Sequence, residues 1–275
     1  MNIDAHQHFW QLARGDYGWL TPGLSPLYRD FMPDDLTPLL QESGIDGTIL
    51  VQAAPTVAET EFLLGLADKS PFILGVVGWV DFAAPTAVED IARITQHPKL
   101  VGLRPMIQDI ADDEWMLQAD LTPAFEAMID HDLTFDALVL PRHLSNLREL
   151  LSRHPDLRTV IDHGAKPDIS GAQFNDWAID IACLAQETGA YCKLSGLLTE
   201  AGDGWTPAAV APYVTHLFDQ FGPYRLVWGS DWPVLTAAAD YGSWVNLAKS
   251  LISKKPHQNA IFGSNARVLY RLFQR

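Results

Sequence analysis

Two histidines and an aspartate lie within the first eight residues, at a spacing that places them on one face of a short strand. Asp4, His6 and His8 are separated by single residues, and because strand side chains alternate between faces, all three point the same way. Two imidazoles that converge from one strand end can hold a divalent metal ion, or polarise a carbonyl group and orient a water molecule. This segment is therefore half of a candidate catalytic site.

The other half lies near the far end of the chain. Within residues 226–233, an apolar run is followed by Ser230, Asp231 and Trp232. This is the pattern of a buried strand with an acid at its carboxyl end. A carboxylate there can act as a general base. A His-x-His pair on the first strand and an acid on the last indicate a ring of strands whose ends meet.

The segments between these two sites alternate between short apolar runs and longer amphipathic stretches. The runs are rich in β-branched and aromatic residues, as buried parallel strands are. Eight strand–helix units in about 250 residues predict a single-domain (β/α)8 TIM barrel over residues 1–275. The predicted strands are 2–8, 47–52, 73–79, 100–104, 134–140, 158–163, 190–195 and 225–228; the predicted helices are 34–43, 56–69, 85–96, 122–131, 143–153, 171–188 and 207–220, with 239–252 and 257–273 as a final helical layer.

The alternative fold is a doubly wound sheet, but no glycine-rich turn follows the first strand, which argues against a dinucleotide site there. Two connections are longer than is usual, residues 10–33 and 197–207. Both follow strands, so both belong on the catalytic face of a barrel, where they are expected to cover a pocket and contact the substrate.

Composition limits the classes of partner. Of the 275 residues, 48% are hydrophobic and 19% charged, which favours a well-buried core over disorder. A formal charge of −15 repels nucleic acid and anionic membranes, and no apolar run is long enough to span a bilayer. We expect a cytoplasmic enzyme, monomeric or homo-oligomeric, with a small-molecule substrate.

The carboxyl ends of barrel strands converge on one bowl, so polar residues at those ends are the candidate site. Arg104 follows the fourth predicted strand, and its planar guanidinium suits a carboxylate or a developing anion. His143 follows the fifth strand beyond a proline. Further candidates for this bowl are Gln52, Asp162, His163, Lys166, Lys193 and Ser195.

These motifs resemble the amidohydrolase superfamily in its sugar-lactonase branch, which includes fuconolactonases, rhamnonolactonases and pyrone-dicarboxylate lactonases. The resemblance covers nearly the whole chain. The motifs that carry it are Asp4-Ala-His6-Gln-His8-Phe9-Trp10, Gly102-Leu-Arg104-Pro105, Asp162-His163-Gly-Ala-Lys166-Pro167, Lys193-Leu-Ser195-Gly196, Gly229-Ser-Asp231-Trp232-Pro233 and Phe262-Gly-Ser-Asn265-Ala266.

The resemblance implies a hydrolase that opens the lactone ring of a sugar acid by attack of water on the carbonyl. Asp231 would be the general base, and His6, His8 and His163 would polarise the carbonyl and stabilise the oxyanion, directly or through a metal. Substrate contacts are expected from Arg104, Lys166, Lys193, His143, Trp10 and Trp232.

One departure from the family pattern bears on the metal. Binuclear amidohydrolases carry a carboxylated lysine after the fourth strand, where this chain has Leu103, Arg104 and Pro105, so a bridged two-metal site is not expected. Two alternatives stay open. Either no metal is required, or one divalent cation, zinc or manganese, is held by His6, His8, His163 and Asp231.

The sequence also leaves alternative reactions open. A sugar-acid lactone isomerase would use similar residues, and a metal-dependent decarboxylase shares the same fold. A non-catalytic sugar-acid binder is disfavoured, because both the His-x-His pair and Asp231 are intact. The identity of the sugar lactone is not determined by these motifs.

Overall fold

Eight parallel strands form a ring in chain order, and this confirms the predicted barrel. The structure is a computed structural model and describes residues 1–272. Strands one to eight pair successively from β1 to β8, and the ring closes where Asp231 N donates to His6 O (2.8 Å) and His8 N donates to Trp232 O (2.7 Å). The strands are β1 (Ile3–Gln7), β2 (Gly47–Val51), β3 (Ile73–Gly78), β4 (Leu100–Leu103), β5 (Thr134–Ala137), β6 (Thr159–Ile161), β7 (Tyr191–Leu194) and β8 (Leu226–Trp228).

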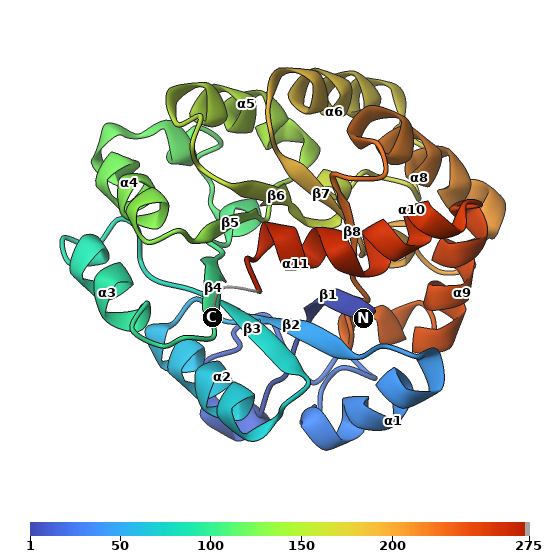
Figure 1. Cartoon of the computed structure of the whole chain (residues 1–275), viewed down its shortest axis with the longest axis horizontal. Helices are drawn as coiled ribbons and strands as arrows, with labels where there is room; N and C mark the ends of the chain where they lie inside the picture. Colours follow the sequence, from blue (N-terminus) through green and yellow to red (C-terminus); the bar gives the residue numbers. More distant parts are fainter. Residues whose placement is uncertain (273–275) are drawn as a thin grey trace.

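Helices surround this ring (Figure 1). Their apolar faces pack on the strands: Leu147, Leu150 and Leu151, for example, recur at helical spacing in α5 and are buried. The helices of the outer layer are α1 (Pro33–Ser43), α2 (Val57–Lys69), α3 (Ala87–Ile94), α4 (Thr122–Asp130), α5 (Leu144–Arg153), α6 (Asn175–Glu187), α8 (Pro207–Phe221) and α9 (Tyr241–Leu251). A short helix, α7 (Leu197–Glu200), lies in the connection after β7.

The interior of the barrel is apolar toward its amino end and polar toward its carboxyl end. Small and branched side chains fill the amino half, as packing inside a narrow ring requires. They come from nearly every strand and include Ile3, Ala5, Ile49, Val51, Val77, Val101, Val160 and Val227, which pack with Ala266, Leu269 and Tyr270 of the C-terminal segment.

The C-terminal segment, residues 257–273, was predicted to belong to a final helical layer. In the structure α10 (Lys255–Asn259), a π-helical turn (Ala260–Ser264) and α11 (Asn265–Leu269) cross the amino end of the barrel (Figure 1). Asn265 Nδ2 donates to Leu226 O at 2.7 Å, and Tyr270 Oη donates to Asp136 Oδ2 inside the barrel at 2.8 Å. Residue 273 lies outside the described residues.

The connections at the carboxyl end position the site. Residues 8–32 fold back on themselves, since Trp10 and Phe31 exchange backbone hydrogen bonds of 3.0 Å in both directions. The connection after β4 runs to α4 at Thr122 and contains three short 3-10 turns. Trp19 of the first connection and Met106, Gln108 and Asp109 of the second line a pocket above the strand ends.

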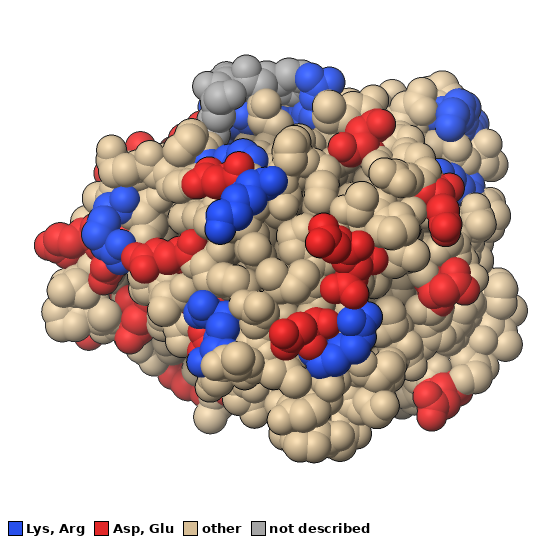
Figure 2. Space-filling model, turned by 90° about the horizontal axis from the view of Figure 1, so that it is seen from below, with Lys and Arg blue, Asp and Glu red and all other residues tan. Residues whose placement is uncertain are grey.

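The surface carries both signs of charge. On the face drawn in Figure 2, basic side chains stand singly or beside acidic ones, and uncharged residues cover most of the area. Within residues 1–272, the helices are all too short or too polar to cross a lipid bilayer.

Candidate active site

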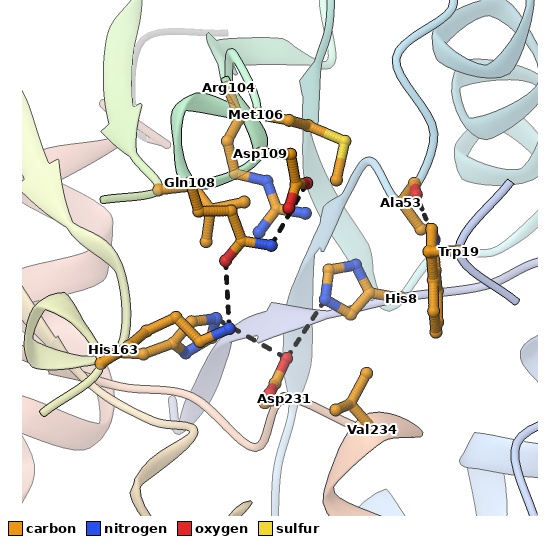
Figure 3. A pocket seen from close by; sticks show the side chains of 12 residues that line it. His8, Trp19, Ala53, Arg104, Met106, Gln108, Asp109, His163, Asp231 and Val234 are labelled. Atoms are coloured by element: carbon orange, nitrogen blue, oxygen red, sulfur yellow. Dashed lines mark hydrogen bonds and ion pairs between the residues drawn. The ribbon is translucent and has the colours of Figure 1, made fainter. Parts of the chain in front are cut away.

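A pocket of about 210 Å³ opens at the carboxyl end of the barrel, where the predicted catalytic residues meet (Figure 3). Strands β1, β4, β6 and β8 each deliver a side chain to it from one to three residues beyond the strand end. The lining residues are His8, Trp19, Ala53, Arg104, Met106, Gln108, Asp109, Leu138, His163, Lys166, Asp231 and Val234.

Asp231 lies at the centre of three imidazoles. Its Oδ1 is 3.2 Å from His8 Nε2, 3.6 Å from His6 Nε2 and 3.9 Å from His163 Nε2. The backbone of Asp231 is left-handed (φ 59°), a conformation that aspartate tolerates better than most residues and that occurs often at functional sites. This turn directly after β8 directs the carboxylate into the pocket.

The hydrogen bonds of His8 fix which of its nitrogens carries a proton. Its Nδ1 lies 2.8 Å from the carbonyl oxygen of Val51, which can only accept, so Nδ1 is the donor. In the neutral ring, Nε2 then presents a lone pair to Asp231 Oδ1 at 3.2 Å and to His6 Nε2 at 3.1 Å. Lys193 donates to His6 Nδ1, so the proton of neutral His6 is on Nε2, where that proton or a bound cation can bridge the two acceptors.

His6 and His163 are buried and held neutral. Burial, with the nearby Lys193 ammonium, lowers the pKa of His6 well below its usual value, and burial lowers the pKa of His163 to about 4. His163 Nδ1 lies 2.8 Å from Ser195 Oγ. Gly196 must be glycine here, because a Cβ would lie 2.7 Å from the His163 ring and φ is +67°.

Asp231 stays ionised at neutral pH. Burial by itself would raise its pKa, but the imidazoles of His163, His8 and His6 that face the carboxylate outweigh burial and lower the pKa below its usual value. A carboxylate beside neutral imidazoles is able to accept a proton, which is the property required of a general base.

The donor set fits one divalent cation. One ligand atom each from His6, His163 and Asp231 lie within 4.8 Å of one another, and two imidazoles with a carboxylate suit zinc or manganese. The predicted fourth ligand, His8, is not part of this compact group but contacts both His6 and Asp231.

Cationic and amide side chains line the pocket beside this cluster. Arg104 is 3% exposed and bonds Asp162 Oδ2 through Nη1 at 3.2 Å, while Nη2 donates to the carbonyl of Gln52. Lys166 donates to Gln108 Oε1 at 3.0 Å, and its Nζ lies 3.5 Å from Glu200. These groups give an acidic protein a local site able to bind oxygen-rich or anionic groups.

Four of the predicted substrate-binding residues are not in the pocket lining. Lys193 is fully buried beneath it, between Asp136 and Asp162, with its Nζ 2.9 Å from His6 Nδ1. His143 Nε2 faces Asp113 Oδ1 at 3.2 Å, so it points to the neighbouring loop.

The two predicted tryptophans belong to the packing of the first loop. Trp10 has no exposed surface and donates to the carbonyl of Arg29 at 2.7 Å. Trp232 is 2% exposed and packs edge-on against Phe9 and Phe31. The tryptophan that lines the pocket is instead Trp19.

The sequence analysis missed the contribution of the β4 connection. Met106, Gln108 and Asp109 line the pocket, yet only the connections after the first and seventh strands were expected to do so. A signal was present, since residues 104–121 also follow a strand end and exceed the usual length of such a connection.

The barrel, with its polar cluster at the carboxyl strand ends, defines a family. A family model described as amidohydrolase matches residues 3–272, so the chain belongs to the amidohydrolase family.

Among curated proteins, the chain is 47% identical to an L-fucono-1,5-lactonase of Burkholderia ambifaria, over 98% of this chain and 95% of that protein. It is 36% identical to an L-fucono-1,5-lactonase of Burkholderia multivorans, over 99% and 96% of the two chains. A crystal structure of an amidohydrolase from Burkholderia multivorans with bound zinc is 34% identical, superposes with a TM-score of 0.94, and covers 98% of this chain and 99% of that one.

Proposed function

We propose that this protein is a lactonase that hydrolyses L-fucono-1,5-lactone. The observation that carries the proposal is the ionised Asp231 carboxylate at the pocket, surrounded by three imidazoles. The two curated relatives named as L-fucono-1,5-lactonases support the substrate, since each aligns with at least 98% of this chain. A volume of about 210 Å³ suits a single sugar-sized ring better than a drug-sized ligand.

Asp231 is the proposed general base. It takes a proton from the attacking water as the water oxygen bonds to the lactone carbonyl carbon, giving a tetrahedral intermediate. When the bond between that carbon and the ring oxygen breaks, the same proton is delivered to the ring oxygen. The products balance as one molecule of water added, which yields a free carboxylic acid and a new hydroxyl.

Arg104, Lys166 and Gln108 are the proposed substrate-binding groups. All three line the pocket, and their N–H groups can donate to the carbonyl oxygen and the ring hydroxyls. A donor that meets the oxygen as it becomes negative stabilises the tetrahedral intermediate more than the neutral lactone. Lys193 and His143 do not line the pocket, so their proposed role is indirect, through their contacts with His6 and Asp113.

We propose that His6, His163 and Asp231 hold one divalent cation, zinc or manganese, with His8 beside them. Such an ion, when bound, polarises a carbonyl and lowers the pKa of a water molecule. Asp162 restrains this group from below, because its Oδ1 is 3.5 Å from His6 Nδ1 and its Oδ2 accepts from Arg104.

The test is a pH-indicator assay with the purified protein and a panel of sugar-acid 1,4- and 1,5-lactones. The expected result is acid release with L-fucono-1,5-lactone above its stereoisomers. Protein stripped of metal and then reloaded with zinc or manganese is assayed beside it, and recovery on reloading shows that the cation takes part. No acid release from any lactone, with the protein folded and metal-loaded, would overturn the proposal.

A further inference from the structure

A second cavity lies next to the catalytic pocket and is larger, at about 560 Å³. The two cavities share Trp19, Met106 and Asp109 in their linings, so they adjoin at the carboxyl end of the barrel. Asp231 and the proposed substrate-binding groups Arg104, Lys166 and Gln108 line the pocket, and none of these four lines the second cavity. A monosaccharide lactone therefore leaves the second cavity without an occupant.

Aromatic rings form much of the wall of this cavity. Trp79, Phe82 and Trp115 line it together with Trp19, and the rings of Phe82 and Trp115 lie 6.3 Å apart. Trp19 is fixed in place, because its indole N–H donates to the carbonyl of Ala53 at 2.8 Å (Figure 3). Fixed aromatic faces pack well on the C–H face of a sugar ring, which is flat and only weakly polar.

The charged residues of the cavity are all acids. Asp16, Asp81 and Asp109 line it, and no Lys, Arg or His among residues 1–272 does so. Carboxylate oxygens accept hydrogen bonds from hydroxyl groups, and Asp16 Oδ1 is a buried acceptor with no partner in the described structure. Three carboxylates without a cationic side chain in the lining exclude an anionic occupant.

Two observations favour an uncharged occupant over a cation. Asp16 is already neutralised, since its Oδ2 lies 2.6 Å from Arg14 Nη2. The adjoining pocket is lined by Lys166 and Arg104, whose charge repels a cation joined to the bound lactone. A ring bearing only hydroxyl groups meets both the aromatic walls and the carboxylates without an electrostatic penalty.

We propose that the second cavity binds an uncharged sugar ring, so that the enzyme accepts sugar-acid lactones that carry a glycosyl group. This substrate class rests on the proposed lactonase function. The lactone ring lies in the catalytic pocket, and the glycosyl ring passes the wall formed by Trp19 and Met106 to reach Trp115 and Asp16.

The first test is equilibrium binding, which does not depend on turnover. Methyl glycosides of glucose, galactose and fucose are titrated by calorimetry against wild-type protein, W115A and W115F, with glucosamine and glucuronate as charged probes. We expect at least one neutral glycoside to bind, at least tenfold more weakly in W115A, with binding restored in W115F. Thermal unfolding of each variant verifies that it is folded.

Three results of this titration would overturn the proposal. They are no binding by any neutral glycoside, tighter binding of glucosamine or glucuronate than of the neutral sugars, and equal binding to folded W115A and wild type. A protein that binds glycosides through Trp115 but hydrolyses no lactone would leave this site standing and overturn only the lactonase function.

The second test compares D-glucono-1,5-lactone with cellobiono-1,5-lactone, which differ by one neutral glucose ring. In wild type, kcat/KM for the glycosylated lactone is expected to exceed that for its parent about tenfold, and the ratio is expected to approach one in W115A. Trp115 does not line the catalytic pocket, so the parent lactone supplies the internal reference. A ratio that is the same in wild type and W115A, or no turnover of the glycosylated lactone where its parent is hydrolysed, would contradict the proposal.

Discussion

The two ends of the barrel differ in how their buried polar groups are paired. At the carboxyl end, His8 Nε2 and Asp231 Oδ1 face each other at 3.2 Å with His6 Nε2 beside them, and a pocket opens next to this group. At the amino end, α11 closes the barrel, and Asp136 accepts hydrogen bonds from both Lys193 and Tyr270. Buried polar groups that are paired stabilise the fold, whereas unpaired groups that converge mark a place where a ligand or proton is needed.

Lys193 joins the two ends. Its ammonium lies between Asp136 and Asp162 and also 2.9 Å from His6 Nδ1. Tyr270, from the C-terminal segment, reaches the same Asp136. Closure of the amino end is thus connected by three direct contacts to an imidazole of the candidate site. We therefore expect substitutions on the carboxyl side of Lys193, toward the pocket, to affect activity. Substitutions on its amino side, toward α11, are expected to affect stability.

The largest effect is expected for D231N. Loss of the general base lowers kcat for L-fucono-1,5-lactone by about 10²- to 10⁴-fold, since amide nitrogen cannot accept the proton. The melting temperature changes little, because Asn keeps the shape of the side chain. The pH-indicator assay and a thermal melt measure both, with D219N, an exposed acid on α8, as the control. Near-normal turnover in D231N would remove Asp231 from the mechanism.

K193M is expected to lower both the stability and the activity of the protein. Removing the ammonium leaves Asp136 and Asp162 as adjacent buried carboxylates without their shared cation, which costs about 3–5 kcal/mol in the free energy of unfolding. Turnover falls as well, because His6 loses the group that holds its Nδ1. Urea denaturation and kcat are measured together. A variant with normal stability and only a raised KM would instead place Lys193 in contact with substrate.

Glu59, at the carboxyl end of the barrel, is expected to make the free energy of unfolding depend on pH. Burial raises its pKa to about 7, although its carboxylate accepts hydrogen bonds from the backbone N–H groups of Ala53 and Ala54. A folded-state pKa above the unfolded value stabilises the fold at low pH, and this contribution is lost as pH rises through about 7.

The measurement for Glu59 is the free energy of unfolding of wild type and E59Q at pH 5, 6, 7 and 8. The difference between the two proteins isolates Glu59 from other titrating groups. Wild type is expected to lose up to about 3 kcal/mol relative to E59Q across this range. Parallel pH profiles for the two proteins would show that Glu59 does not titrate in this window.

The smallest effect is expected for Y270F. Without the hydroxyl, Asp136 loses one donor, at a cost of about 2 kcal/mol in the free energy of unfolding. Activity at a temperature where the variant stays folded is expected to fall less than in K193M. T134V is the matched control, because Thr134 Oγ1 bonds Leu269 O in the same segment without touching Asp136. No loss of stability in Y270F would show that the hydrogen bond to Asp136 contributes nothing and that Tyr270 acts only through packing.

Much of this molecule follows from local sequence pattern. Alternating apolar and amphipathic segments predicted the barrel, which is confirmed, because strand and helix periodicity are set by nearest neighbours along the chain. The prediction of a sugar-acid lactonase agrees with the curated relatives. His6, His8, His163 and Asp231 do converge, although their catalytic roles, the oligomeric state and the cytoplasmic location stay predictions.

Only the tertiary structure decided which polar side chains reach the pocket. Lys193 and Lys166 both follow or end a strand, yet one is sealed between Asp136 and Asp162 and the other lines the pocket beside Gln108. The C-terminal segment was predicted to be helical, but only the structure shows that it closes the amino end of the barrel. Periodicity tells which side of a segment is buried, whereas the partner against which it is buried depends on contacts between residues far apart in the chain.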